Sequence, residues 1–96
     1  MLEDFTVTTF AERVGETFRV GDGPDAVEME LLEANDVPRL SEEGRVPFSI
    51  VFRGPVEPVL PQRIYRFEHD ELGSFELFIV PIGPDEAGMQ YQAVFG

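Results

Sequence analysis

The sequence contains no cysteine and no lysine, and its only histidine is His69. Without cysteine the chain cannot form disulfides, thiolate zinc sites, iron–sulfur clusters or a cysteine nucleophile. Without lysine it lacks both a Schiff-base amine and the lysine of a phosphate-binding loop. A lone histidine cannot supply the two-histidine ligand sets of common zinc and iron sites. We therefore predict a protein that is not an enzyme and that uses no cofactor or metal.

Long apolar runs and a cationic leader are also missing. A membrane-spanning helix needs roughly 18 or more consecutive apolar residues, and the N-terminal region carries Glu3, Asp4, Glu12 and Glu16 instead of a positive start. We expect a cytoplasmic protein without membrane contact. A chain of 96 residues with 43% hydrophobic content is long enough for one core, which predicts a single acidic domain over residues 1–96.

Positive charge is scarce. Seven basic residues, all arginine, face nineteen acidic residues, so the formal net charge is −12. Repulsion of phosphate disfavours binding to nucleic acid or anionic lipid. The acidity has three interpretations that stay open here: a solubilising surface, attraction to a basic partner protein, or mimicry of a nucleic-acid backbone. Mimicry would require carboxylates in a stripe at phosphate-like spacing.

Apolar residues alternate with polar ones along most of the chain after Gly15, a pattern that predicts strands. The alternating sets are Phe18 and Val20; Val27, Met29 and Leu31; Phe48, Ile50 and Phe52; Tyr65 and Phe67; residues 74–82; and Met89, Tyr91, Ala93 and Phe95. Turn-forming stretches separate most of these sets, at residues 21–25, 70–73 and 83–88. The chain is therefore predicted to be mostly β, a six-stranded antiparallel small barrel or sandwich.

A short helix is predicted ahead of the strands. Thr9 and Glu12 have the spacing of a capping box and Gly15 would end the helix, which gives a helix over residues 10–15. Residues 35–45 are polar and predict an exposed connection.

Two strands show irregular patterns. The adjacent Leu31-Leu32 predicts a bulge in the second strand, and a phase slip between Leu77 and Phe78 predicts another. Residues 74–82 are the most apolar stretch and predict a central strand buried on both faces for part of its length. Either the N-terminal helix or a second copy of the chain would then cover the outer face, so homo-oligomerisation stays open.

The segment that follows the third strand, RGPVEPVLPQ, is our first choice for an interaction surface. Proline cannot donate to a ladder, so the strand should stop before Pro55. Further prolines would hold the linker in an extended, polyproline-like form that loses little entropy on docking to a partner. The guanidinium of Arg53 would anchor that partner, or would simply pair with a nearby acid. The predicted interaction residues are Arg53, Gly54, Pro55, Pro58, Pro61 and Gln62.

A rival interpretation is a small-ligand-binding barrel or an enzyme, in which Arg53, Tyr65 and His69 would be the polar groups of the site. His69 either closes a strand and hydrogen-bonds the following turn, or acts as a metal ligand or general base. Its neighbour Glu68 should point to the opposite face of the strand, which argues against a shared ion. An open, polar-lined cavity around the three residues would favour this rival.

Other chemistries find weak support. The serines (Ser41, Ser49 and Ser74) lie outside any nucleophile-elbow motif. The acidic turns at residues 22–25, 70–71 and 85–86 leave calcium binding open, but none has the ligand spacing of a calcium-binding loop.

Several motifs together resemble a small bacterial domain family of unknown function. They are Phe52-Arg53-Gly54-Pro55, Leu60-Pro61-Gln62, Glu68-His69 with Leu72-Gly73, Val80 to Asp85, and Tyr91 to Phe95. The resemblance spans nearly the whole chain and carries no activity or catalytic residue with it. It implies an accessory or assembly role, in the company of phage-tail-like, collar-type proteins. Both lines of evidence favour a non-enzymatic module that acts through protein–protein contact.

Overall fold

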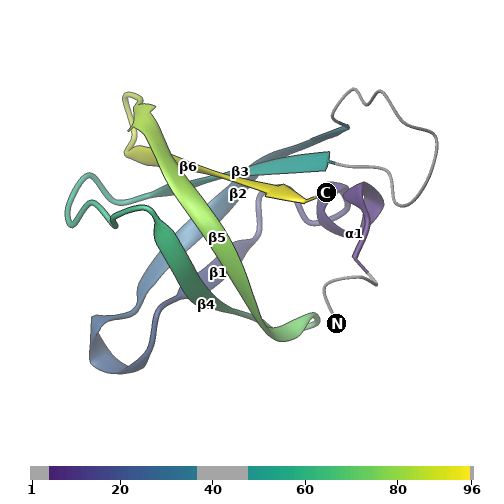
Figure 1. The fold of residues 1–96 in the computed structure, drawn as a ribbon, viewed down its shortest axis with the longest axis horizontal. Coiled ribbons are helices and arrows are strands. Elements are labelled where there is room, and N and C mark those ends of the chain that lie inside the picture. The colour runs from purple at the N-terminus through teal and green to yellow at the C-terminus, as the bar shows by residue number, and fades with distance from the viewer. Residues whose placement is uncertain (1–4, 37–47, 96) are drawn as a thin grey trace.

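A computed structural model describes residues 5–36 and 48–95, which form a closed, six-stranded antiparallel β-barrel with a short N-terminal helix (Figure 1). The elements are α1 (Val7–Ala11), β1 (Thr17–Val20), the 3₁₀ helix η2 (Gly23–Asp25), β2 (Val27–Asp36), β3 (Phe48–Gly54), β4 (Arg63–His69), β5 (Gly73–Pro84) and β6 (Met89–Phe95). Their order around the barrel is β1-β2-β3-β6-β5-β4. The prediction of a mostly β fold is confirmed, and of its two forms the barrel is correct.

The barrel closes through a short contact between β1 and β4. Arg19 lies opposite Glu68, and Val20 lies opposite Phe67. All neighbouring strands are antiparallel, and the β4–β5 hairpin turns at Gly73, whose φ of 80° suits glycine.

Aromatic side chains fill the interior because the alternating residues of each strand point inward. Fifteen residues make up this core: Phe10, Phe18, Val20, Met29, Leu31, Phe48, Ile50, Phe52, Phe67, Phe75, Leu77, Ile79, Tyr91, Ala93 and Phe95. The inward faces predicted from alternation are thus the observed ones. Since these side chains occupy the barrel, its interior is a packed core.

The helix begins earlier than predicted. α1 starts after Thr6, whose hydroxyl accepts a hydrogen bond from the Thr9 backbone N–H, while the Thr9 hydroxyl accepts one from the Thr6 N–H. The predicted capping box with Thr9 and Glu12 is therefore wrong, because Thr9 occupies the third helical position and a second threonine replaces the usual glutamate. Phe10 of this helix is completely buried in the core.

Of the two predicted bulges, one is present and the other is not. The bulge in β2 is present, with a register shift between Leu31 and Glu33. In β5 the alternation runs unbroken from Phe75 to Ile79, and the register shifts instead between Pro81 and Gly83.

The β5 strand is also not buried on both faces, because Phe78 remains 49% exposed. α1 packs against β2 and β3, so it does not cover the outer face of β5. The connection predicted over residues 35–45 begins later than expected, because β2 continues through Asn35 and Asp36. Residues 37–45 of that prediction lie outside the described residues.

Within the described part of the chain, no helix is long and apolar enough to cross a membrane.

Candidate functional site

The segment that joins β3 to β4, residues 55–62, crosses one end of the barrel, and we call it the crossover loop. β3 and β4 lie three positions apart in either direction around the closed sheet, so the loop must span the mouth. α1 lies at the other end (Figure 1). The strand, crossover, strand arrangement predicted from the prolines is the observed one.

The end of β3 is fixed by close backbone packing. Gly54 is buried and pairs with Met89, and a Cβ added at Gly88 would overlap the Gly54 carbonyl oxygen. Only glycine fits at position 88, because the two backbones approach without room for a side chain. The ladder then stops at Pro55 as predicted, since proline carries no N–H.

Two tyrosine hydroxyls hold the second half of the crossover loop on the barrel. The Leu60 backbone N–H donates to the Tyr91 hydroxyl at 2.8 Å, and the Tyr65 hydroxyl donates to the Pro61 carbonyl at 2.8 Å. Tyr91 is completely buried, and Leu60 packs against the core. Partial burial raises the pKa of Tyr65, which keeps its hydroxyl protonated as a donor. The loop is therefore anchored by directional contacts.

Residues 55–59 of the crossover loop are exposed. Val56 and Val59 are 62% and 51% exposed, and Glu57 lies between them. The chain bends at residues 56–58, where the Glu57–Pro58 peptide is cis. The expected extended, polyproline-like course is thus wrong at this bend, because a polyproline helix runs without bends. The apolar tips that face solvent are the two valines, which the sequence-based residue set did not include.

Arg53 is engaged within the chain. Its Nε and NH2 atoms lie 2.9 and 2.7 Å from the same Asp85 carboxylate oxygen, and NH1 lies 3.7 Å from Glu30. The hydrogen bond to Asp85 and its negative charge raise the pKa of Arg53. Arg53 therefore pairs with a nearby acid, Asp85, which is one of the two roles that the sequence suggested for it.

Asp85 organises the β5–β6 turn. One carboxylate oxygen accepts the backbone N–H groups of Ala87 and Gly88, both at 2.8 Å. The other accepts from Arg53 and from the Gln90 side-chain amide at 2.7 Å. These bonds, led by the one from Arg53, hold the pKa of Asp85 well below its ordinary range. Because Arg53 and the turn use both oxygens, the acidic turn at residues 85–86 has a structural explanation without calcium.

The rival ligand residues do not converge. Arg53 lies on β3, on the opposite wall of the barrel from Tyr65 and His69 on β4. Along β4, Tyr65 and His69 are four residues apart, about 13 Å in a strand. Each of the three side chains has its own separate hydrogen-bond partners.

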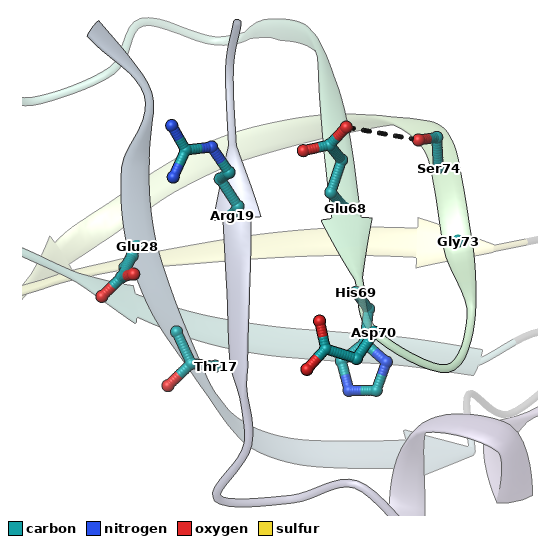
Figure 2. Close-up of a pocket in the computed structure, with 8 residues that line it drawn as sticks. All are labelled: Thr17, Arg19, Glu28, Glu68, His69, Asp70, Gly73 and Ser74. Carbon is teal, nitrogen blue, oxygen red and sulfur yellow. Dashed lines mark hydrogen bonds between the residues drawn. The ribbon is translucent and has the colours of Figure 1, made fainter. Parts of the chain in front are cut away.

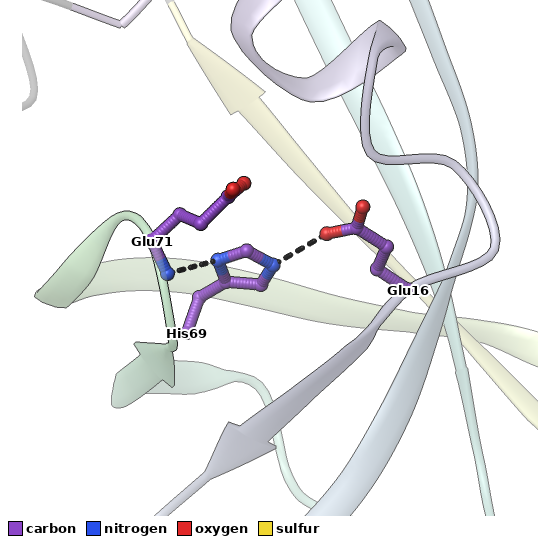
Figure 3. A group of neighbouring side chains, drawn as sticks. All are labelled: Glu16, His69 and Glu71. Atoms are coloured by element: carbon purple, nitrogen blue, oxygen red, sulfur yellow. Dashed lines mark hydrogen bonds and ion pairs between the residues drawn. The ribbon is translucent and has the colours of Figure 1, made fainter.

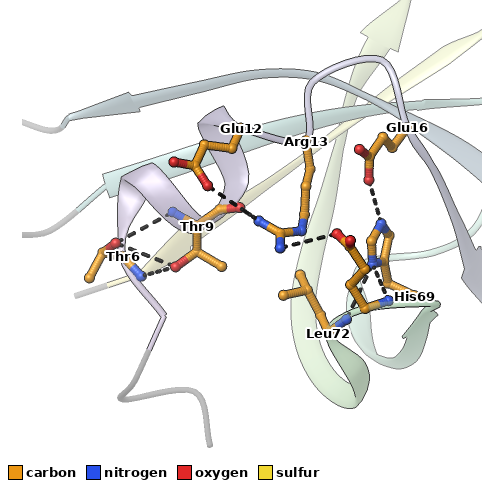
Figure 4. A network of polar contacts seen from close by, with 8 residues as sticks. Thr6, Thr9, Glu12, Arg13, Glu16, His69 and Leu72 are labelled. Atoms are coloured by element: carbon orange, nitrogen blue, oxygen red, sulfur yellow. Dashed lines mark hydrogen bonds and ion pairs between the residues drawn. The ribbon is translucent and has the colours of Figure 1, made fainter.

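His69 closes the β4–β5 turn and contacts the N-terminal segment. Its Nδ1 atom accepts the backbone N–H of Glu71 at 3.0 Å, and its Nε2 atom lies 2.6 Å from a Glu16 oxygen (Figure 3). Nδ1 also accepts the Leu72 N–H at 3.3 Å (Figure 4). The side chain is 5% exposed, and its ring lies 4.5 Å from that of Phe18. Since Nδ1 accepts, the ring proton is on Nε2 and is donated to Glu16. The observed contacts of His69 are therefore those expected of a residue that ends a strand and hydrogen-bonds the following turn.

Glu16, His69 and Glu71 have ligand atoms within 4.8 Å of one another, a spacing that a metal ion could bridge. A metal on Nε2 would have to displace the proton that Glu16 accepts, while both turn N–H groups occupy Nδ1. Arg13 also lies 3.2 Å from Glu71 and donates to the Thr9 carbonyl at 2.7 Å (Figure 4). Glu16, His69 and Glu71 are thus each engaged by a hydrogen bond or an ion pair, and these contacts tie the segment after α1 to the β4–β5 turn, although the Nε atom of Arg13 is buried without a hydrogen-bond partner.

A shallow hollow of about 510 Å³ lies outside the barrel, over β1 and β4 (Figure 2). Arg19 sits there between Glu28 and Glu68, its cross-strand neighbours, and Glu68 accepts a long hydrogen bond of 3.5 Å from Ser74. Charges of both signs alternate across these strands, as on an ordinary solvated sheet face.

Sequence reasoning missed the contacts that four residues make at these sites: Arg13, Glu16, Asp85 and Tyr91. Asp85 carried a weak signal, because aspartate often accepts the N–H groups of a following turn. The other three act across the fold, so no local pattern could identify them.

The described residues define a small closed β-barrel with a packed aromatic interior and a crossover loop over one mouth. Residues 5–95 match the family described as Domain of unknown function (DUF6916), and the chain belongs to this family. The resemblance to a domain family of unknown function is thereby confirmed. No curated protein and no solved structure matches the chain.

Proposed function

We propose that this barrel is a non-enzymatic interaction module that binds a partner protein through the crossover loop. The observation that carries the proposal is the contrast within the loop. Its second half is anchored to Tyr91 and Tyr65, whereas Val56 and Val59 face solvent. A segment whose conformation is already fixed loses little entropy on binding, so its exposed apolar tips are suited to docking.

The partner that fits this loop is a protein with an apolar pocket and basic groups around it. Glu57 lies exposed between the two valines, and the acidic chain attracts positive charge over longer distances. The finer form of the proposal is an assembly role, as an accessory to a phage-tail-like structure. Its support is the sequence resemblance alone.

The rival functions have less support. Packed aromatic side chains occupy the barrel where a small ligand would sit, and the polar residues suggested for that site lie apart. For nucleic-acid mimicry, several carboxylates would have to form a uniform stripe, yet Arg53 and Arg66 are interleaved with acids on the outer faces.

Affinity capture from the native cell tests the proposal. The bait is the full chain, compared with a Val56→Ser/Val59→Ser double variant and with Val14→Ser, which alters a similarly exposed valine (48%) in the N-terminal segment. We expect the wild-type chain and the control to retain the same partner and the double variant to lose it. Equal recovery of the same proteins by all three baits would refute the loop as the docking site.

A further inference from the structure

The outer face of the barrel carries an uncharged stripe that crosses β4, β5 and β6. Ile64 lies directly opposite Phe78, and Val80 lies directly opposite Gln92. Phe78 and Val80 are two residues apart on one face of β5, as are Gln92 and Val94 on β6. We call these five residues, Ile64, Phe78, Val80, Gln92 and Val94, the uncharged stripe.

Large apolar side chains of the stripe face solvent. Ile64 is 59% exposed, Phe78 is 49% exposed and Val94 is 64% exposed. On β3, the next strand beyond β6, the outward-facing Val51 is only 6% exposed, so the exposed region ends there. An exposed apolar area of this kind, spread over three adjacent strands, is typical of an interaction surface.

The charges beside the stripe indicate what it would bind. Arg66 and Glu76 form the next cross-strand pair along the β4–β5 hairpin, one residue of each sign. Arg66 makes two long ion pairs, 3.8 Å to Asp22 and 3.6 Å to Glu68, and donates a 3.3 Å hydrogen bond to Ser74, while its side chain remains 49% exposed. A basic partner would find no carboxylate in the stripe itself. By contrast, this face presents one apolar cross-strand pair, Ile64 with Phe78, beside one pair of opposite charges, Arg66 with Glu76. Such a surface is complementary to a copy of itself rotated by a twofold axis.

We propose that the uncharged stripe is the interface for a second copy of this chain, packed face to face about a twofold axis. In such an isologous contact, Phe78 and Ile64 of the two copies pack together, and Arg66 of each copy faces Glu76 of the other. Two chains of net charge −12 repel each other over most of their surfaces, and the stripe is a face on which that repulsion is small. The stripe excludes the crossover loop, so this inference is independent of the proposed partner site.

Sedimentation of the full chain over a concentration series up to millimolar tests the proposal. We expect a monomer–dimer equilibrium for the wild type, and about a thirtyfold weaker dimer for Phe78→Glu and for Ile64→Glu, because each buries a charge in the interface. Val14→Glu adds the same charge at another exposed site (48%) and should leave dimerisation unchanged. Circular dichroism shows whether each variant is folded. If one of the two stripe variants is unfolded, the dimerisation of the other one tests the proposal.

A charge-reversal series tests the orientation of the two copies. Arg66→Glu and Glu76→Arg should each weaken the dimer, and the double variant should restore it, because the pair is re-formed with its signs exchanged. A wild-type chain that stays monomeric throughout would overturn the proposal. So would a dimer that tolerates both stripe variants, or a double reversal that dimerises no better than the weaker single variant.

Discussion

At the helix end of the barrel, packed aromatic rings close the interior, with the polar contacts of Arg13, Glu16 and His69 beside them, whereas at the crossover end hydrogen bonds to tyrosine and aspartate side chains hold the chain in place. Phe10 of α1 is completely buried and its ring lies 5.5 to 6.4 Å from those of five other phenylalanines: Phe5, Phe18, Phe48, Phe75 and Phe95. At the other end, the Tyr91 hydroxyl holds the crossover loop, and Asp85, paired with Arg53, holds the neighbouring β5–β6 turn.

The difference suggests a division of roles between the two ends. Burial of aromatic surface is non-directional and contributes strongly to stability. Hydrogen bonds contribute less net free energy but fix geometry, which is what a loop with exposed side chains needs in order to bind. We therefore expect substitutions at the helix end to reduce stability most, and substitutions at the crossover end to change the loop's local order.

The largest expected effect is at Phe10. Phe10→Ala should lower the free energy of unfolding by about 3–5 kcal/mol, since it removes a buried ring and leaves a cavity at the barrel end. Leu60→Ala is the corresponding truncation within the crossover loop. It should lower the free energy of unfolding by about 1–2 kcal/mol, because Leu60 is only partly buried. Urea denaturation measures both, and equal losses would contradict the asymmetry between the ends.

The next largest effect is expected at the crossover end. Gly88→Ala should cost about 1–3 kcal/mol, because the new methyl group overlaps the Gly54 carbonyl oxygen and forces the β5–β6 turn away from β3. Glu86→Ala changes an exposed residue of the same turn and should alter stability by less than about 0.5 kcal/mol. Similar denaturation midpoints for the two variants would show that the turn has room for a side chain.

Tyr91→Phe isolates the hydrogen bond that anchors the loop. It should cost about 1 kcal/mol, because the Leu60 N–H loses its acceptor while the ring remains packed. Hydrogen exchange at Leu60 should accelerate more than exchange at core amides. Tyr65→Phe, which frees the exposed Pro61 carbonyl, should have a smaller effect since water can replace the lost donor. An unchanged Leu60 exchange rate in Tyr91→Phe would refute the anchoring role.

The strands and their inward faces were predictable because each depends on a local period of two. Alternation from Phe48 to Phe52 and from Met89 to Phe95 identified the observed core faces. The boundary of α1 was not predictable in the same way, because Thr9 could cap a helix or, as it does, complete a box with Thr6. In β5 the apolar run hid the alternation, since Phe78 and Val80 are outward-facing yet as apolar as their inward neighbours.

The candidate sites could be predicted only in part. Prolines and Gly54 identified the crossover loop, because their backbone restrictions are properties of single residues. The contacts of Arg53 with Asp85, and of His69 with Glu16, join residues more than thirty positions apart in the chain. Such contacts depend on how the barrel closes, and so the sequence could supply candidate partners but not the pairs.

The smallest expected effect concerns pH and the Arg53–Asp85 pair. The folded chain holds the pKa of Asp85 below its unfolded value of about 3.9. Its stabilising contribution should therefore be fully present above about pH 5 and be lost as the pH falls below 4. Asp85→Asn removes the titrating charge at nearly constant volume, so the wild type should exceed it in stability at pH 7, and the gap should narrow toward pH 3. Urea denaturation at a series of pH values measures the gap; a gap that stayed constant would mean that Asp85 acts through turn geometry alone.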